Sequence, residues 1–185
     1  MSVGLLILRL AVGLTIAAHG AQKLFGWFGG HGLKGTSSYF EMTGLRPGLP
    51  NVIVAGLAEG VGGLLLASGL LTPLGVAALV GMMAAAIMFV HLRQGFFAQN
   101  GGFEYPFMLG LVGAALAFTG PGAYSLDAAL GWSLHSTPWA LGSIVVGLAA
   151  AAAVGVGREV YNRWSPRQNQ GGHTPAGRAG SPTLA

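Results

Sequence analysis

The stretch VGLLILRLAVGLTIAAHGAQKLFGWF, residues 3–28, decides the class of fold. It exceeds the roughly 20 helical residues that cross the hydrocarbon core of a bilayer, and only Arg9, His19, Gln22 and Lys23 interrupt it. A cleaved signal peptide has a basic segment before a shorter apolar run. Because this stretch lacks that segment and carries Arg9 inside the run, we expect it to stay in the protein as a transmembrane helix.

The composition agrees with a membrane protein. Of the 185 residues, 52% are hydrophobic and 8% are charged, whereas soluble domains carry about a quarter charged residues. The 33 glycines favour close packing of helices in lipid. The chain has no cysteine, which excludes disulfides, thiolate metal sites, iron–sulfur ligation and thiol redox chemistry by the chain itself. The basic residues lie between and after apolar runs, a pattern that indicates membrane orientation rather than binding of nucleic acid.

Four more apolar stretches follow, over residues 51–71, 73–94, 104–119 and 138–157. They predict an all-α transmembrane helical bundle of about five helices, of which the fourth is the shortest. We expect a four-helix membrane core over residues 1–135, a further transmembrane helix over 136–157, and a basic, disordered cytoplasmic tail over 158–185.

Five spans would place most Lys and Arg residues on one side of the membrane. The connections on the other side, around Thr72 and over residues 120–138, contain no Lys or Arg. The positive-inside rule then predicts a multi-pass protein of a bacterial cytoplasmic membrane, with the C-terminus cytoplasmic and the N-terminus outside. The basic residues of the cytoplasmic side are Lys23, Lys34, Arg46, Arg93, Arg158, Arg163 and Arg167.

Ionisable residues inside a membrane are costly, and they are the first candidates for a functional site. Glu59, near the middle of the second stretch, must be protonated or paired with a cation. Arg9, His19 and Lys23 lie within about 80° on one face of the first helix and offer such partners. We therefore predict His19, Lys23 and Glu59 as catalytic residues, and His19, Lys23, Arg9 and His91 as cofactor-binding residues, with no metal site.

Structural roles remain open for each of these residues. Arg9 and Glu59 could form a buried ion pair that fixes the helix register, and Lys23 could extend to the headgroups. His91 near a helix C-terminus suits the helix dipole. His19 and His91 on one membrane side could also ligate a haem, although no haem-pocket pattern surrounds them.

Three groups of residues carry a family resemblance. They are Arg9-x-x-x-Gly13 with His19-Gly20-x-x-Lys23-Leu24, Glu59-Gly60-x-Gly62-Gly63 with Gly69-x-x-Thr72, and Gly101-Gly102-x-Glu104-Tyr105. Together they resemble the DoxX family of bacterial membrane proteins over about residues 5–130. The resemblance implies a four-helix membrane core linked to redox chemistry, as in subunits of thiosulfate:quinone oxidoreductase or membrane partners of thiol-handling enzymes.

The first functional hypothesis is an accessory or anchoring subunit of a membrane oxidoreductase or respiratory complex. Its partners would be the lipid bilayer and other subunits, or further copies of the chain. They would be reached through the predicted cytoplasmic loop over residues 29–50, the basic tail or the Ala/Gly face of the fifth helix. The alternative is a quinone-interacting oxidoreductase subunit with quinone as a non-covalent cofactor at His19, Lys23 and Glu59. A small transporter is a third hypothesis. Many transporters contain internal inverted repeats, but helices one and two do not resemble helices three and four. The sequence leaves open whether the chain is itself an enzyme.

Overall fold

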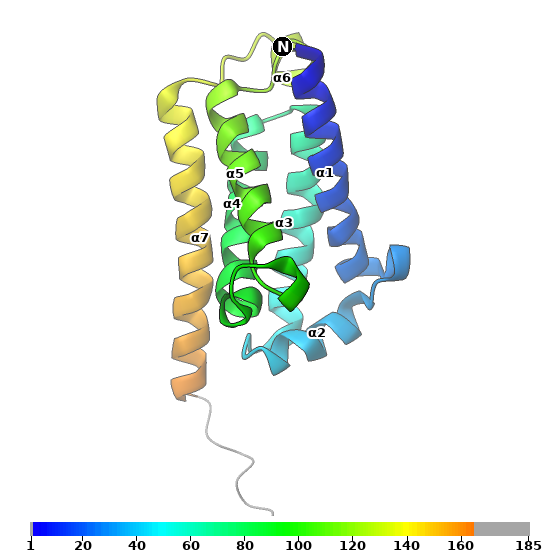
Figure 1. Cartoon of the computed structure of the whole chain (residues 1–185), viewed down its shortest axis with the longest axis vertical. Helices are drawn as coiled ribbons and strands as arrows, with labels where there is room; N and C mark the ends of the chain where they lie inside the picture. The colour runs from blue at the N-terminus through cyan, green and yellow to red at the C-terminus, as the bar shows by residue number, and fades with distance from the viewer. Residues whose placement is uncertain (1, 165–185) are drawn as a thin grey trace, which may run out of the picture.

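The structure, a computed structural model, describes residues 2–164, and all the regular secondary structure in this range is helical, without a strand (Figure 1). The long helices are α1 (Ser2–Phe25), α3 (Gly48–Ser68), α4 (Thr72–Ala86), α5 (Glu104–Thr119) and α7 (Thr137–Trp164). The shorter elements are η1 (Trp27–Gly29), α2 (Gly32–Met42), the π-helical η2 (Ile87–His91), η3 (Leu92–Gln94), η4 (Ala98–Asn100) and α6 (Leu126–Ala129).

The five long helices run side by side along the long axis of the molecule, and α2 lies across one end of them (Figure 1). Four helical segments are long and apolar enough to cross a membrane: α1, α3, α7 and the continuous run Thr72–Gln94. The remaining helix, α5, is apolar but has 16 residues, which gives it a length of about 24 Å. The predicted all-α membrane bundle is confirmed, with α5 as its short member.

Two segments differ from the sequence-based expectation. The connection over residues 29–50, predicted as a loop, contains α2, whose short polar sequence gives no transmembrane signal. The C-terminal helix extends to Trp164 rather than ending at residue 157. Its last turns are tied to the bundle by Arg158, which donates to the backbone carbonyls of Thr43 and Gly44 just after α2. They also carry an exposed Arg163–Glu159 ion pair of 2.9 Å. The rest of the predicted tail, residues 165–185, lies outside the described residues.

The most extensive packing joins α1 to α3, and glycines make it possible. A Cβ on Gly13 would lie 2.5 Å from the amide nitrogen of Ala67, and one on Gly63 would lie 2.5 Å from that of Ala17. A Cβ on Gly20 would collide with the backbone of Gly60. The two backbones therefore touch directly along what we call the α1–α3 seam, as small residues allow in membranes.

The Ala/Gly-rich helix α7 is packed in a similar way against α4. Its buried residues are Ala140, Ser143, Gly147 and Ala151, and a Cβ on Gly81 of α4 would lie 2.8 Å from the carbonyl oxygen of Gly147. The small residues proposed as a face for partner subunits are thus in part already covered within the chain.

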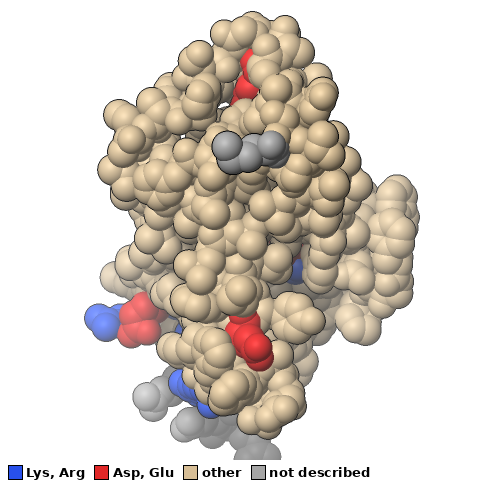
Figure 2. All heavy atoms as spheres, turned by 45° about the horizontal axis from the view of Figure 1, so that its top comes forward, with Lys and Arg blue, Asp and Glu red and all other residues tan. Residues whose placement is uncertain are grey.

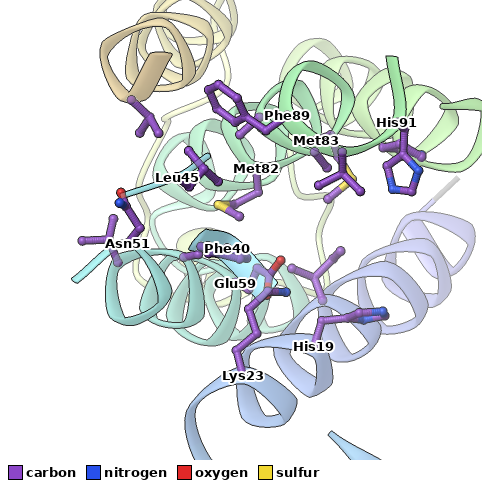
Figure 3. Close-up of a pocket in the computed structure, with 18 of the residues that line it drawn as sticks. His19, Lys23, Phe40, Leu45, Asn51, Glu59, Met82, Met83, Phe89 and His91 are labelled. Carbon is purple, nitrogen blue, oxygen red and sulfur yellow. The ribbon is translucent and has the colours of Figure 1, made fainter. Parts of the chain in front are cut away.

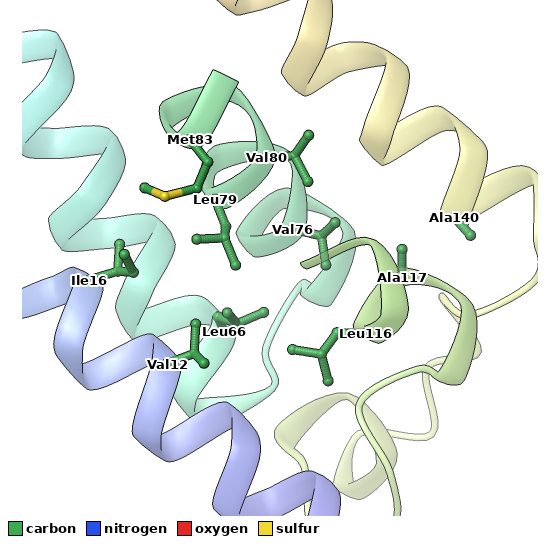
Figure 4. Close-up of a cluster of buried hydrophobic side chains, with 10 residues drawn as sticks. All are labelled: Val12, Ile16, Leu66, Val76, Leu79, Val80, Met83, Leu116, Ala117 and Ala140. Carbon is green, nitrogen blue, oxygen red and sulfur yellow. The ribbon is translucent and has the colours of Figure 1, made fainter. Parts of the chain in front are cut away.

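The hydrophobic core gathers side chains from α1, α3, α4, α5 and α7 (Figure 4). Val76 and Leu116 are fully buried, and Leu66 and Leu79 nearly so. Large apolar side chains also cover the outside of the helices, for example Leu14, Val61 and Val145 at 52%, 54% and 62% exposure. An apolar outer surface of this kind is suited to contact with the lipid of a bilayer rather than with water.

Charged side chains are scarce over the middle of the bundle, and most of those visible in Figure 2 lie toward one end. That end carries α2, the connection from η3 to α5, and the C-terminal end of α7 (Figure 1). We call it the α2 end. The opposite end, where α1 begins, carries the turn between α3 and α4 and the connection that contains α6.

The α1–α3 seam predicts opposite effects for two glycines of one helix. Gly63→Ala should lower the free energy of unfolding in mixed micelles by about 1–3 kcal/mol, because the new methyl group overpacks against α1. Gly60→Ala is the matched control, since nothing lies within 4 Å of its added Cβ. It should be neutral or stabilising by up to about 1 kcal/mol through helix propensity. Equal effects of the two substitutions would contradict the direct backbone contact.

Candidate functional site

A cavity of about 650 Å³ lies in the half of the bundle next to the α2 end. Its walls come from α1, α2, α3, α4 with η2, α5 and one residue of α7, and most of them are apolar (Figure 3). Volume and lining are those of a small-molecule site with a few polar groups. The apolar walls include Ile16, Phe40, Leu45, Ala55, Met82, Met83 and Phe89, and the polar residues are Thr15, His19, Lys23, Tyr39, Asn51, Glu59, His91 and Tyr105.

Lys23 and Glu59 form an ion pair in the wall of this cavity. The Lys23 Nζ lies 2.5 Å from Oε2 of Glu59, and the two side chains are 20% and 7% exposed. The α1–α3 seam brings them together, because Gly20 of α1 lies against Gly56 and Gly60 of α3. The buried carboxylate thus has the cation that the sequence required.

His19 lines the cavity one turn before Lys23, with its ring in a defined state. Its Nδ1 lies 2.8 Å from the carbonyl oxygen of Thr15. A carbonyl only accepts hydrogen bonds, so Nδ1 donates. In neutral His19 the Nε2 then carries a lone pair that can take up a proton.

His91 approaches the cavity from η2 in the same state. Its Nδ1 lies 2.7 Å from the carbonyl oxygen of Gly101 and donates to it. The π-helical turn Ile87–His91 contributes Phe89, Val90 and His91 to the lining, and such turns are frequent at functional sites. The facing connection is fixed by Glu104, which accepts from the amide of Ala98 at 2.9 Å rather than capping its own helix. His91 therefore belongs to the cavity as well as to a helix end.

Arg9 is placed elsewhere, and the structure contradicts the Arg9–Glu59 ion pair that was left open as a structural role. Arg9 is fully buried in the N-terminal half of α1, away from Lys23, and its Nη2 donates to the carbonyl oxygen of Tyr124 at 2.5 Å. It is not among the residues that line the cavity. Glu59 lies at the level of Lys23, since α3 runs antiparallel to α1 and Gly63 already faces Gly13.

The connection over residues 120–138 holds Asp127, an acidic residue that was not among the predicted site residues. Asp127 is fully buried and accepts from the amides of Leu71 and Thr72 at 2.7 and 3.0 Å and from the Thr72 hydroxyl at 2.7 Å. It thereby satisfies free N–H groups at the start of α4. The sequence signal that could have identified Asp127 was its position as an acidic residue, without a nearby cation, in an otherwise uncharged connection.

The cavity opens sideways between α1 and α5. Thr15 and His19 on α1 are exposed, and Tyr105 on α5 is 72% exposed, although all three line the cavity. These residues form its rim, which lies on two of the long helices, α1 and α5. A ligand can therefore enter from the bilayer.

The arrangement supports proton transfer next to an apolar ligand. It combines two imidazoles with free Nε2 atoms and a buried Lys–Glu pair. Among residues 2–164, no group of three or more His, Cys, Asp and Glu side chains could hold a metal ion.

The family model described as DoxX matches residues 4–92, from the first turn of α1 to the first residue of η3. All five predicted site residues lie within this match, whereas the Gly101–Tyr105 motif, α5 and α7 lie beyond it. No curated protein and no solved structure matches the chain.

A double-mutant cycle tests whether the Lys23–Glu59 pair is coupled. Lys23→Met should destabilise the protein more in the wild-type background than in Glu59→Gln, because the single substitution leaves a buried carboxylate without its cation. We expect a coupling free energy of about 1–3 kcal/mol from equilibrium unfolding in mixed micelles. The exposed pair Glu159–Arg163 provides the matched control and should show no measurable coupling. Additive effects of Lys23→Met and Glu59→Gln would refute the pairing.

Proposed function

We propose, for a chain that belongs to the DoxX family over residues 4–92, that the cavity binds a lipid-soluble quinone or quinol. The protein would then act as the quinone-facing membrane subunit of an oxidoreductase complex. The observation that carries the proposal is the apolar cavity, open toward the bilayer, with His19, His91 and the Lys23–Glu59 pair in its walls.

The residues present suit such a ligand in three respects. Aliphatic, aromatic and methionine side chains can enclose a quinone ring, and the sideways opening leaves room for an isoprenoid tail in the lipid. The Nε2 atoms of His19 and His91 can bind both forms of the ligand. In the protonated state they donate to the carbonyl oxygens of a quinone, and in the neutral state they accept from the hydroxyl groups of a quinol. Quinone supplies two-electron chemistry that is coupled to two protons.

The chain's own part in this chemistry would be to move protons. His19 would exchange a proton with the bound ligand through Nε2, while its Nδ1 stays on the Thr15 carbonyl. The Lys23–Glu59 pair, one helical turn away, would hold a proton in transit toward the α2 end. Because the chain has no cysteine, thiol-derived electrons would have to come from a partner subunit. The accessory role and the quinone role are thus two aspects of one proposal.

Binding of a short-chain quinone to protein in nanodiscs tests this function. His19→Ala should raise the dissociation constant about tenfold, which corresponds to about 1.4 kcal/mol, because a hydrogen-bonding group in the cavity is removed. His135→Ala is the matched control, since His135 lies outside the cavity lining and should leave the affinity unchanged. The proposal would be refuted if the wild type showed no saturable binding, or if both variants bound the quinone with the same dissociation constant as the wild type.

The same proposal includes an orientation. Of the Lys and Arg residues in the described part of the chain, Arg9 alone lies toward the end where α1 begins. By the positive-inside rule the α2 end faces the cytoplasm. Fluorescent protein fused to the C-terminus should therefore fluoresce in a bacterial host, and alkaline phosphatase fused at the same point should be inactive. The reverse pair of readings would show the opposite orientation.

A further inference from the structure

A second, smaller cavity of about 240 Å³ lies at the α2 end, between α7 and the start of α3. Its polar lining consists of Arg46, Asn51, Arg158 and Tyr161. Asn51 and Val154 also line the larger cavity, so the two spaces are neighbours. The lining contains two guanidinium groups and no carboxylate.

Arg158 is held firmly in this cavity by the backbone. Its Nε donates to the carbonyl oxygen of Gly44 at 3.1 Å and its Nη2 to that of Thr43 at 3.0 Å. Its guanidinium carbon lies 5.6 Å from the ring centre of Phe89. These neutral partners fix the direction of the guanidinium but leave its positive charge uncompensated, and the charge can attract an anion.

Arg46 adds a second positive charge without a carboxylate partner in residues 2–164, where the ion pairs are Lys23–Glu59 and Arg163–Glu159. The acidic residue of α2, Glu41, is engaged elsewhere, because its Oε1 accepts from the amide of Gly48 at 3.1 Å. Two guanidinium groups that share one small cavity are well suited to a phosphate group, which Arg binds through several hydrogen bonds.

The position of the cavity indicates where the phosphate comes from. It lies beside the last turns of the membrane helix α7, next to Tyr161 and near the exposed Trp164, and such aromatic residues mark the interface between lipid and water. Basic pockets between helices at this level bind the headgroups of anionic lipids. We propose that Arg46 and Arg158 bind the phosphate of an anionic phospholipid, which ties α7 to the segment between α2 and α3. This proposal is independent of the quinone site.

Native mass spectrometry of the delipidated full-length protein, titrated with phosphatidylglycerol or phosphatidylcholine in detergent, tests the proposal. The wild type should retain phosphatidylglycerol several-fold better than phosphatidylcholine. Arg46→Gln should lose at least fivefold of that retention, because one of the two cations is removed. Arg46 is the residue to change, since Arg158 also holds the backbone just after α2. An unchanged unfolding temperature without lipid would confirm that the variant is folded.

The matched control is Arg93→Gln, which removes a positive charge at the same end but outside the cavity lining, and it should retain phosphatidylglycerol like the wild type. A parallel titration with inorganic phosphate separates a lipid phosphate from a free one. Equal loss in the two variants, no preference for phosphatidylglycerol, or displacement of the lipid by millimolar inorganic phosphate would each overturn the proposal.

Discussion

The direct contact between the backbones of α1 and α3 is the constraint on which the rest of the molecule depends. Gly13 and Gly63 leave no room for a side chain between the two helices, so each residue of α1 has a fixed neighbour on α3. This register brings Lys23 to Glu59. It also holds α1 against α3 rather than against α5, and the space left between α1 and α5 is the mouth of the larger cavity.

The bundle is thereby divided into two halves with different chemistry. In the half where α1 begins, the ionisable groups Arg9 and Asp127 are buried and bonded to backbone groups of the connecting turns, which suits a structural role. In the other half, His19, His91 and the Lys23–Glu59 pair surround a cavity. Ionisable groups in a membrane protein are costly in both places, but only those around the cavity can meet a ligand.

The sequence predicted the features that depend on local pattern. Apolar stretches predicted the long helices, and the 33 glycines indicated close packing of helices. Features that depend on distant contacts were missed. Arg9 pairs with a segment 115 residues away, and helical periodicity carries no information on such a contact. The amphipathic helix α2 and the π-helical turn at His91 have no strong sequence signal. The last turns of α7 depend on Arg158, whose partners lie near α2.

The central claim is that an apolar ligand of the quinone class occupies the cavity from the lipid side. The most direct test is labelling with a photoreactive quinone in membranes, followed by peptide mapping. The account predicts that labels concentrate on the cavity-facing residues of α1, α4 and η2, such as His19, Met82 and Phe89, and that excess unmodified quinone suppresses them. Labels spread over the outward-facing residues of α7, such as Val145 and Leu148, and unaffected by competitor, would contradict it.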